Sequence, residues 1–325
     1  MIVISKFYAP YRDIVFKSSD NIKEIIYLYS SDTNRAWTNE VESNSFRLFD
    51  ISTNYFELVF IIPFLSVYKR ALKHDTIIVN YLNFSSVILL ICCKFLKKKI
   101  VYFSDVHPDN LNSNYYKIKR FLFDYTVVNY LPKNLELKKC FVSPLISNKS
   151  LTITTDYLSR KYDFIIVGQF TSRKNYSFLI ELIKKQNDKY SFLVVGKGEE
   201  YIDKQLRGLN VEVINNVNYD SMFELYNNSK ILLAPSKFDV WGLNVQEALL
   251  CGCHVIGTNN IGSCVAFKEH PNCNIVDSFE SILWETKINS IINNIPSDIS
   301  QLKYLKDINE SIKAFEDINN ITRRS

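Results

Sequence analysis

Short apolar runs alternate with amphipathic stretches along most of this chain, and polar or turn-forming residues bound each run. Short continuous apolar runs are typical of strands buried in a parallel sheet, whereas apolar residues spaced three and four apart are typical of helices packed on it. The predicted strands cover 75–80, 100–104, 124–129, 164–168, 191–195, 211–214, 230–234 and 254–257. The predicted helices cover 85–96, 115–123, 177–184, 221–227, a segment after 242, and 305–318. This alternation of strand and helix predicts an α/β fold.

A polar stretch rich in Ser and Thr, 144–160, interrupts this alternation and is typical of a linker. A chain of 325 residues is long enough for two domains of about 150 residues each. We expect one domain over 1–150, a linker over 151–160 and a second domain over 161–302. Two Rossmann-like doubly wound domains facing each other across a cleft are the simplest arrangement, and such sheets bind ligands beyond the carboxyl ends of their strands.

Two strongly apolar stretches, 58–68 and 85–96, are too short to cross a bilayer, which takes roughly 20 residues. We expect both to form buried helix segments. The apolar start of the chain, 1–7, is also too short for a secretory signal. The seven cysteines are odd in number and have no metal-ligand spacing. We therefore expect reduced thiols, a cytoplasmic location and no bound metal.

Positive charge is concentrated in the first half of the chain. Residues 1–150 hold 20 Lys and Arg against 13 Asp and Glu, whereas the remainder holds 19 against 21. Two basic clusters contribute to this surplus: Lys94, Lys97, Lys98 and Lys99, and Lys117, Lys119 and Arg120. They favour peripheral contact with an anionic membrane surface or binding of a phosphate-bearing acceptor; the alternative is a solvated helix face. We expect no nucleic-acid partner.

Glycine is confined to the second half. All eight glycines lie between Gly168 and Gly262, and the first 167 residues contain none. Glycine is used where the backbone turns with a positive φ or approaches a ligand closely. The second half is therefore expected to hold the ligand.

The segment 235–252 carries the most informative chemistry of this half. It runs from the end of a predicted strand through a loop into a helix, whose first backbone N–H groups form a natural phosphate site. These groups lie near Gly242, Leu243 and Asn244. Two carboxylates, Asp239 and Glu247, stand eight residues apart, one in the loop and one about a turn inside the helix. Carboxylates accept hydrogen bonds from sugar and ribose hydroxyls; the alternative is an ordinary exposed loop and helix.

This segment resembles the Glu-x7-Glu signature of the family 4 retaining glycosyltransferases. The matching positions are Gly242, Leu243, Glu247, Ala248, Gly252, Val255 and Ile256. The resemblance implies that Glu247 holds the ribose hydroxyls of a nucleotide-sugar donor and that Asp239 contacts the transferred sugar. It also implies that the amides near Leu243 and Asn244 meet the diphosphate. Asp239 stands where the family has Glu, so its carboxylate is one methylene shorter, which affects sugar positioning more than charge.

The turn that starts at Gly168 resembles the Gly-Arg…Lys-Gly turn of the same family, whose Arg and Lys clamp the donor phosphates. Lys174 matches the lysine, whereas Gln169 replaces the arginine and Asn175 replaces the second glycine. Cations at this turn would stabilise the charge that develops on the departing diphosphate. We hypothesise that Arg173 supplies the missing charge; the alternative is a pair of solvated basic side chains.

Two further loops carry weaker signals. The turn at Gly196 and Gly198 resembles one that lies near the nucleotide base in the family. It is not a dinucleotide fingerprint, because Tyr201 occupies the third glycine position. His107, in the loop 105–109, corresponds to a histidine that faces the donor sugar in related enzymes, where an imidazole could hydrogen-bond a hydroxyl or stabilise positive charge at the anomeric carbon. The alternative for His107 is a structural role.

The resemblance is close over 163–264 and only topological before it. It implies a GT-B fold, with a last helix, 303–325, that packs back on the first domain. The implied activity is retaining, metal-independent glycosyl transfer without a cofactor, from a UDP- or GDP-sugar to a glycan or lipid-linked glycan acceptor. The implied pathway is the assembly of O-antigen, capsule or another surface polysaccharide at the cytoplasmic membrane face. The implied catalytic residues are Asp239, His107 and Lys174. The implied donor-binding residues are Gly168, Gln169, Arg173, Lys174, Gly196, Gly198, Asp239, Gly242, Leu243, Asn244 and Glu247.

Two other classes of protein are alternatives. A non-catalytic nucleotide-sugar-binding or partner subunit on the same fold is favoured by Gln169, by Asp239 and by the glycine-free first domain. A Rossmann dehydrogenase needs an intact dinucleotide loop, and this chain has only Gly-Lys-Gly. Donor hydrolysis without an acceptor separates a transferase from a binding subunit.

Overall fold

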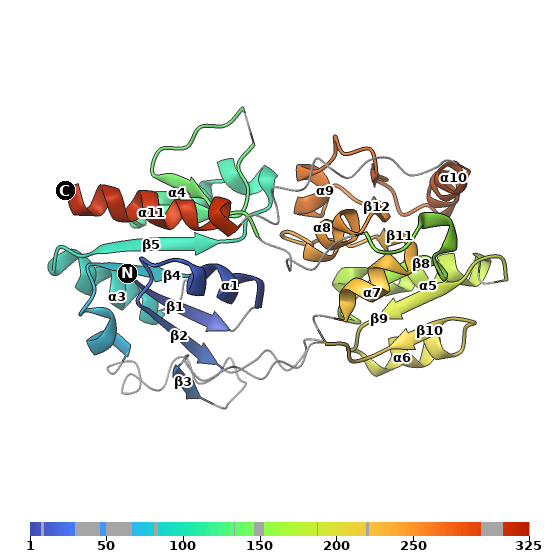
Figure 1. Ribbon diagram of the computed structural model, residues 1–325, viewed down its shortest axis with the longest axis horizontal. Helices are drawn as coiled ribbons and strands as arrows, with labels where there is room; N and C mark the ends of the chain where they lie inside the picture. Colours follow the sequence, from blue (N-terminus) through green and yellow to red (C-terminus); the bar gives the residue numbers. More distant parts are fainter. Residues whose placement is uncertain are drawn as a thin grey trace. The chain divides into compact units, whose positions relative to one another are not determined.

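The computed structural model describes residues 1–7, 10–29, 46–49, 67–80, 84–132, 134–145, 153–186, 188–218, 221–293 and 308–324. The chain forms two compact units (Figure 1). The first unit is built mainly from Met1–Thr33, Glu40–Ile146 and Asp307–Ser325, and the second mainly from Ser147–Lys306. Each unit holds one parallel sheet with helices packed on it. The expected α/β class with two Rossmann-like domains is therefore confirmed.

The described part of the first unit has a seven-stranded parallel sheet in the order β3-β2-β1-β4-β5-β6-β7. Its strands are β1 Ile2–Phe7, β2 Glu24–Tyr29, β3 Phe46–Phe49, β4 Thr76–Val79, β5 Lys99–Ser104, β6 Tyr125–Val128 and β7 Cys140–Val142. Successive residues of a strand point to opposite faces, and apolar residues of β1, β4 and β5 are buried on both faces. Such strands appear in the sequence as continuous apolar runs, which is why β4 and β5 could be predicted.

Helices cover both faces of this sheet. They are α1 Pro10–Ser18, α3 Phe84–Phe95, α4 Asn114–Leu122 and α11 Ile308–Arg324. α1 and α11 share one face, where the rings of Phe16 and Phe315 meet with centroids 6.0 Å apart. α3 packs on the other face through Cys93. The hydroxyl of Ser143 donates a 2.8 Å hydrogen bond to the carbonyl oxygen of Ser311, so the last helix is part of the first unit (Figure 1).

The second unit has a six-stranded parallel sheet in the order β10-β9-β8-β11-β12-β13 within its described residues. The strands are β8 Tyr162–Val167, β9 Phe192–Val195, β10 Glu212–Ile214, β11 Ser229–Ala234, β12 His254–Gly257 and β13 Cys273–Ile275. The helices are α5 Tyr176–Gln186, α6 Glu200–Arg207, α7 Met222–Asn227, α8 Leu243–Leu250, α9 Gly262–Ala266 and α10 Ser281–Ile292. α5, α6 and α10 enclose a core that includes the fully buried side chains of Trp284 and Phe164. α7 and α8 pack against each other and against β11.

Each strand predicted from the apolar runs is present, and β12 has the predicted bounds. The last helix differs most, because it was expected at 305–318 and extends over Ile308–Arg324. The strands and α-helices of the described chain that were not predicted are the strands β1, β2, β3, β7 and β13 and the helices α1, α6, α9 and α10. Of these helices, α6 follows the turn at Gly198 and buries only Ile202 and Leu206 of its eight residues. Two apolar positions in so polar a segment are too few to reveal a helical period.

Two basic residues expected at the surface are buried. Lys119, assigned to a basic surface cluster, donates a 2.7 Å hydrogen bond from its ammonium to the hydroxyl of Tyr102. Arg160, assigned to the linker, donates 2.8 Å hydrogen bonds to the carbonyl oxygens of Ser229 and Cys251. A cation is tolerated inside a protein when its donors are hydrogen-bonded. The partners of Arg160 are distant in the chain, and no sequence pattern distinguishes Tyr102, the partner of Lys119, from other tyrosines. The sequence therefore could not reveal either burial.

The apolar stretch 58–68, expected to form a buried helix, lies outside the described residues up to 66, and residues 67–71 are helical. The other apolar stretch, 85–96, forms the buried helix α3 as expected. Within the described ranges, no helix combines the length and the hydropathy that a membrane-spanning segment needs.

Candidate functional site

The strand order of the second sheet reverses between β8 and β11, and the candidate site lies where these two strands end. The loop after β8 starts at Gly168, and the loop after β11 starts at Pro235 and leads into α8. Asn244, near the start of α8, ties them together, because its side-chain amide donates a 3.0 Å hydrogen bond to the carbonyl oxygen of Val167. Both sequence segments with the strongest chemical signals therefore meet at one edge of one sheet.

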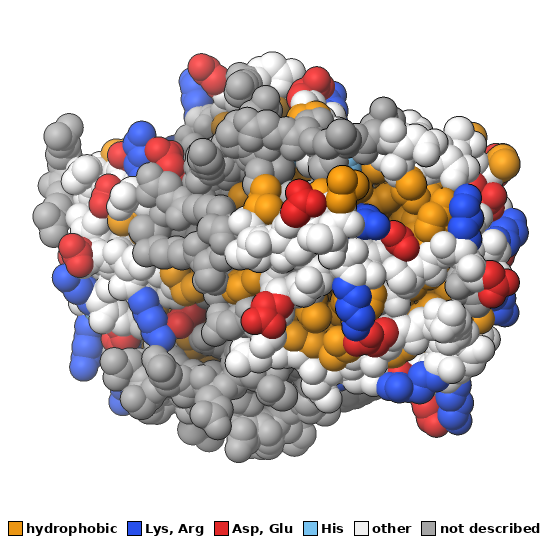
Figure 2. Space-filling view, turned by 45° about the vertical axis from the view of Figure 1, so that its right-hand side comes forward, with side chains coloured by type: hydrophobic (Ala, Val, Ile, Leu, Met, Phe, Trp, Pro, Cys, Tyr) orange, Lys and Arg blue, Asp and Glu red, His pale blue; other side chains and the backbone are white. Residues whose placement is uncertain are grey.

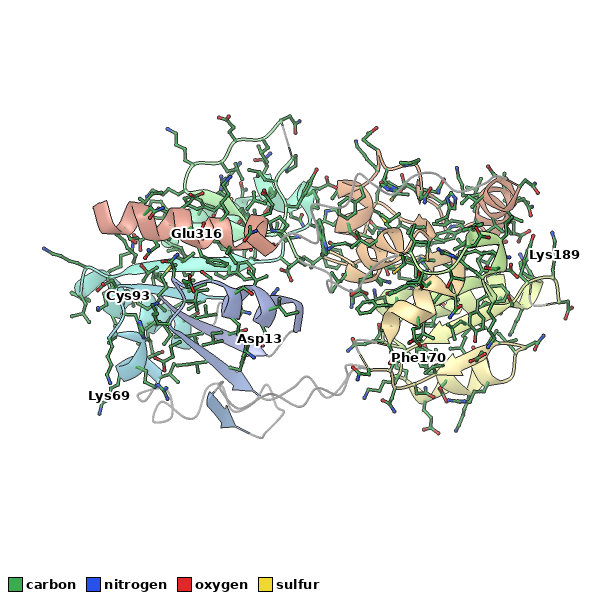
Figure 3. The ribbon with its side chains drawn as sticks, viewed as in Figure 1. Asp13, Lys69, Cys93, Phe170, Lys189 and Glu316 are labelled. Carbon is green, nitrogen blue, oxygen red and sulfur yellow. The ribbon has the colours of Figure 1, made fainter. Side chains whose placement is uncertain are left out.

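The turn after β9 lies against the turn after β8. The N–H of Phe170 donates a 2.8 Å hydrogen bond to the carbonyl oxygen of Lys197, and Phe170 pairs with Gly198 in an isolated parallel bridge. A Cβ on Gly196 would lie 1.9 Å from the carbonyl oxygen of Gly168. Phe170, labelled in Figure 3, is fully buried. Glycine at position 196 is thus required by the contact between two backbones.

Lys174 lies across the turn at Gly168. A Cβ on Gly168, where φ is +153°, would lie 3.1 Å from Cε of Lys174. The next residue, Asn175, ends the 3₁₀ turn Ser172–Lys174 in the left-handed conformation with φ at 59°. Apart from glycine, asparagine is among the residues that adopt this conformation most readily. Asn175, which replaces the second glycine of the resembling turn, therefore adopts a left-handed conformation that glycine also adopts readily.

Lys174, Arg173 and Asp239 form the charged centre of the site. Lys174 donates a 2.6 Å hydrogen bond from Nζ to Oδ2 of Asp239, and Nη1 of Arg173 lies 3.3 Å from the same oxygen. Nη1 of Arg173 also donates a 3.0 Å hydrogen bond to the carbonyl oxygen of Phe238. The side chains of Lys174 and Asp239 are mostly buried, whereas Arg173 is exposed and Gln169 is half-buried in the same turn. The role of Arg173 as a second phosphate clamp stays a prediction.

Burial raises the pKa of the Asp239 carboxyl, but its partners outweigh that effect. The charge and hydrogen bond of Lys174, the charge of Arg173 and the N–H of Trp241 all favour the carboxylate, so its pKa lies below the ordinary value. Because the pKa is depressed in the folded state, the ion pair stabilises the fold above the ordinary pKa of Asp. That contribution is lost as the pH falls through the folded-state pKa. Because this pKa is lowered, Asp239 is charged at neutral pH.

α8 begins at a position that requires glycine. Gly242 has φ at 80°, and a Cβ there would lie 2.5 Å from Cγ2 of Ile261. Its carbonyl oxygen accepts a 2.9 Å hydrogen bond from the hydroxyl of Ser263. Leu243 and Asn244 are the first residues of α8, where backbone N–H groups have no acceptor within the helix. Such groups favour an anion.

Glu247 lies inside α8 and is buried. The hydroxyl of Tyr226 donates a 3.0 Å hydrogen bond to its Oε2. Burial first, and then the charge of Glu247, raise the pKa of the Tyr226 hydroxyl well above its ordinary value. Tyr226 therefore remains a donor and Glu247 an acceptor, which fixes the orientation of the carboxylate. The contact of Glu247 with a ribose stays a prediction.

The loop 258–261 and the start of α9 at Gly262 also border the site, and we did not predict them from the sequence. The N–H of Asp239 donates a 2.9 Å hydrogen bond to the carbonyl oxygen of Asn260, and the N–H of Gly262 donates a 3.1 Å hydrogen bond to the carbonyl oxygen of Asp239. These bonds hold the backbone of Asp239 from both sides. Gly262 was the available signal, because glycine after a buried strand often marks a close backbone approach.

His107 lies in the first unit, in the loop after β5. It is buried and caps the 3₁₀ turn Pro108–Asn112, and its Nδ1 accepts a 3.3 Å hydrogen bond from the N–H of Asp109. The preceding residue, Val106, donates its N–H to Oδ1 of Asn129 at 2.8 Å. These contacts give the loop a fixed conformation and His107 a local structural role. Its role toward a donor sugar stays a prediction.

The chemical groups at the edge of the second sheet are cations, carboxylates and backbone N–H groups. Among the residues that the structure describes, no three His, Cys, Asp or Glu side chains form a group that could hold a metal ion. The seven cysteines are free thiols, and five of them are buried. The arrangement suits an anion with sugar and ribose hydroxyls attached.

Residues 156–299 match the family model described as glycosyl transferases group 1. Among curated proteins, the uncharacterized 41.2 kDa protein in the cps region of Klebsiella pneumoniae is 30% identical over 104 residues, which are 32% of this chain and 29% of that protein. The chain spans less than a third of the length of the curated relatives that it matches.

Two solved structures share the whole architecture. Anabaena Alr3699/HepE, in complex with UDP and glucose, is 13% identical and aligns with a TM-score of 0.69 over 98% of this chain and 99% of that chain. The apo form of the lipopolysaccharide outer core galactosyltransferase WaaB is 13% identical and aligns with a TM-score of 0.65 over 98% of each chain. At such identities the likeness shows the fold alone, which is GT-B.

Proposed function

We propose, from the match of residues 156–299 to the model of the group 1 glycosyl transferases and from the GT-B fold, that this chain is a sugar-transferring enzyme. Its donor would be a nucleoside-diphosphate sugar with UDP or GDP. Its acceptor would be a glycan or a lipid-linked glycan. Transfer would proceed with retention of configuration at the anomeric carbon.

The observation that carries this proposal is the charged centre beside the turn at Gly168, where Lys174 and Arg173 converge on Asp239. Negative charge develops on a nucleoside diphosphate as it departs, and cations held in place stabilise that charge. The first N–H groups of α8, at Leu243 and Asn244, lie at the same edge of the sheet and would bind the diphosphate oxygens. The site therefore offers positive charge without a metal ion or a cofactor, and the proposal assigns neither.

The remaining site residues would bind the neutral parts of the donor. Glu247 would accept hydrogen bonds from the ribose hydroxyls, and the turn at Gly196 and Gly198 would lie near the base. Asp239 would contact the transferred sugar, and His107 would approach it from the first unit. Two hydrogen bonds support these assignments. Tyr226 donates one to Glu247 and Lys174 donates one to Asp239, so both carboxylates are held in place.

In the proposed reaction, the bond between the anomeric carbon and the diphosphate oxygen breaks, and its electron pair leaves with the diphosphate. The acceptor hydroxyl attacks the anomeric carbon from the same face, and its proton passes to the departing phosphate oxygen. Lys174 and Arg173 would stabilise the leaving group, and the Asp239 carboxylate would stabilise positive charge at the anomeric carbon.

The acceptor would be an intermediate in the assembly of O-antigen, capsule or another surface polysaccharide. The relative in the cps region and the likeness to a lipopolysaccharide galactosyltransferase support this pathway class. A lipid-linked acceptor would place the chain at the cytoplasmic face of the membrane. The positive charge of residues 1–150 supports that location.

A non-catalytic nucleotide-sugar-binding or partner subunit is the second candidate, and the replacement of the family's arginine by Gln169 favours it. Release of nucleoside diphosphate from UDP-glucose, UDP-galactose and GDP-mannose without an acceptor distinguishes the two. We expect slow release by the wild type, reduced about 100-fold by Lys174→Met, which keeps the aliphatic stem against Gly168. Lys237→Met, at an exposed lysine of the neighbouring loop, is the matched control. Binding of a donor without any release would support the second candidate instead.

A further inference from the structure

The outward face of α4 is apolar. Tyr115, Ile118 and Phe121 follow one another at intervals of three residues and are 61%, 58% and 86% exposed. The inward face carries Tyr116 and the buried ammonium group of Lys119. A helix at the surface of a water-soluble domain normally has the opposite arrangement. The ring of Tyr115 still lies 4.1 Å from the ammonium group of Lys119, whereas Ile118 and Phe121 expose most of their apolar surface to solvent and point to a partner.

The outward face of α3 continues this apolar surface. Val87, Ile91 and Phe95 follow at intervals of four residues, with Phe95 84% exposed, while Cys93, labelled in Figure 3, is on the buried side of the helix. A shallow hollow joins the two helices. It is lined by Leu90, Ile91, Lys94, Phe95, Phe121 and Leu122. We name the exposed residues of both helices the α3–α4 surface.

The apolar side chains of the first unit are exposed almost exclusively here. Of the eight large hydrophobic residues exposed in its described part, seven lie on or directly after α3 and α4, and the eighth is Ile321. The seven are Val87, Ile91, Phe95, Leu96, Tyr115, Ile118 and Phe121. Single exposed hydrophobic residues are common, whereas a contiguous patch of this kind marks an interaction site.

Basic side chains border the same surface. Lys94, Lys97 and Lys117 are exposed, and Arg120 is half-buried over the ring of Tyr116. Two acidic side chains are in reach, Asp124 at 3.6 Å from Lys94 and Asp75 at 3.7 Å from Lys98, so the border keeps a positive excess. On the face that Figure 2 brings forward, by contrast, acidic and basic side chains are intermixed.

We infer that the α3–α4 surface docks on an anionic lipid bilayer, with Phe95 and Phe121 entering the boundary between headgroups and acyl chains. Exposed aromatic side chains ringed by lysines are the combination by which peripheral proteins bind such surfaces. A second copy of the chain fits less well, because a symmetric pairing would bring the same lysines together. The inference concerns a surface remote in sequence from the donor-binding segments and does not depend on the proposed activity.

Sedimentation with vesicles tests this inference. The full chain is mixed with vesicles of phosphatidylcholine alone or with 30% (about one lipid in three) phosphatidylglycerol, at near-physiological salt. We expect binding to the anionic vesicles, weakened on the order of tenfold or more by Phe95→Ser with Phe121→Ser, because their apolar burial is lost. Lys94→Gln with Lys117→Gln should weaken binding roughly 30-fold, at about a factor of five for each lysine. Ile282→Ser with Tyr201→Ser, at exposed residues of the second unit, should leave binding unchanged.

Absence of binding to anionic vesicles, or equal binding by the double Phe variant, would overturn the inference. A wild-type dimer that becomes monomeric in that variant, without lipid binding, would instead assign the surface to a second copy. Phe121→Trp gives a readout in an otherwise intact chain. Its fluorescence, measured as the difference from the wild type with its three native tryptophans, should shift to the blue with anionic vesicles and be quenched by brominated acyl chains, and no change in either would count against insertion.

Discussion

Lys174 and Asp239, 65 residues apart in the chain, form a 2.6 Å hydrogen-bonded ion pair between the loop after β8 and the loop after β11. The two loops leave neighbouring strands at the point where the strand order of the sheet reverses. The ion pair therefore ties together the two segments that are expected to grip a ligand. A diphosphate bound there, as proposed, would compete with Asp239 for the ammonium group of Lys174.

Asp239→Asn is expected to strengthen the binding of a nucleoside diphosphate about three- to tenfold while lowering its release from the sugar donor. The substitution removes a negative charge beside the diphosphate and frees Lys174, but it also removes the carboxylate that would stabilise the anomeric carbon. Titration calorimetry and a release assay measure the two effects separately. Asp239→Glu, the control, restores the carboxylate of the resembling signature and should change the affinity for the nucleoside diphosphate little. Weaker binding of the nucleoside diphosphate by Asp239→Asn would contradict the prediction and show that the carboxylate holds the ligand directly.

His254 makes the stability of the second unit depend on pH. It is buried, and neither ring nitrogen has a hydrogen-bond partner among the described residues. Burial, followed by the charges of His270 and Arg160, lowers its pKa to about 4. An unfolded histidine titrates near 6.5, so the unfolded chain binds the extra proton between these values. Stability is complete above about pH 6.5 and is lost as the pH falls toward 4.

His254→Gln should therefore reduce the loss of unfolding free energy between pH 7.5 and pH 5 by roughly 2 kcal/mol. Urea unfolding at both pH values, followed through Trp241 and Trp284, measures this difference. His74→Gln, at a histidine of the first unit that hydrogen-bonds Glu24 at 3.2 Å, should leave the difference in place. An unchanged pH dependence in His254→Gln would mean that His254 is not the buried neutral group.

Gly196→Ala is expected to lower the free energy of unfolding by at least about 2 kcal/mol, because its Cβ would meet the carbonyl oxygen of Gly168 at 1.9 Å. Gly208→Ala is the matched control, since its Cβ would have its nearest neighbour at 3.4 Å, an ordinary contact. We expect the control to change stability by less than about 1 kcal/mol. Equal effects of the two substitutions in denaturant unfolding would contradict the close approach of the two turns.

Much of the fold could be predicted because its strands are buried on both faces and so appear as continuous apolar runs. β12 is the clearest case, predicted at 254–257 and observed at His254–Gly257. The turn at Gly168 and the turn at Gly196 were also marked in the sequence, by glycine in a chain that otherwise uses little of it. The helix α6 was missed because its polar surface leaves too few apolar residues to show a period.

The pairings within the site could not be predicted, because sequence spacing does not show which carboxylate meets which cation. The order of strands in the sheet, rather than the distance along the chain, brings Lys174 to Asp239 and Tyr226 to Glu247. The burial of Lys119 has the same origin, since its partner Tyr102 lies on β5. Asn175 differs from these pairings, because its place in the turn can be explained from its residue type alone. It stands where the resembling turn has glycine, and asparagine adopts the left-handed conformation observed there.

Binding of UDP and GDP to the wild type, to Lys174→Met, to Glu247→Ala and to the control Lys237→Met is the most direct test of a donor site at the edge of the second sheet. Each lost charge-assisted hydrogen bond is worth about 1.5–3 kcal/mol. We therefore expect one nucleotide to bind the wild type and the control, and to bind both site variants about 10- to 100-fold more weakly in titration calorimetry. Equal affinity in all four proteins, or no binding of either nucleotide by the wild type at millimolar concentration, would contradict a donor site there.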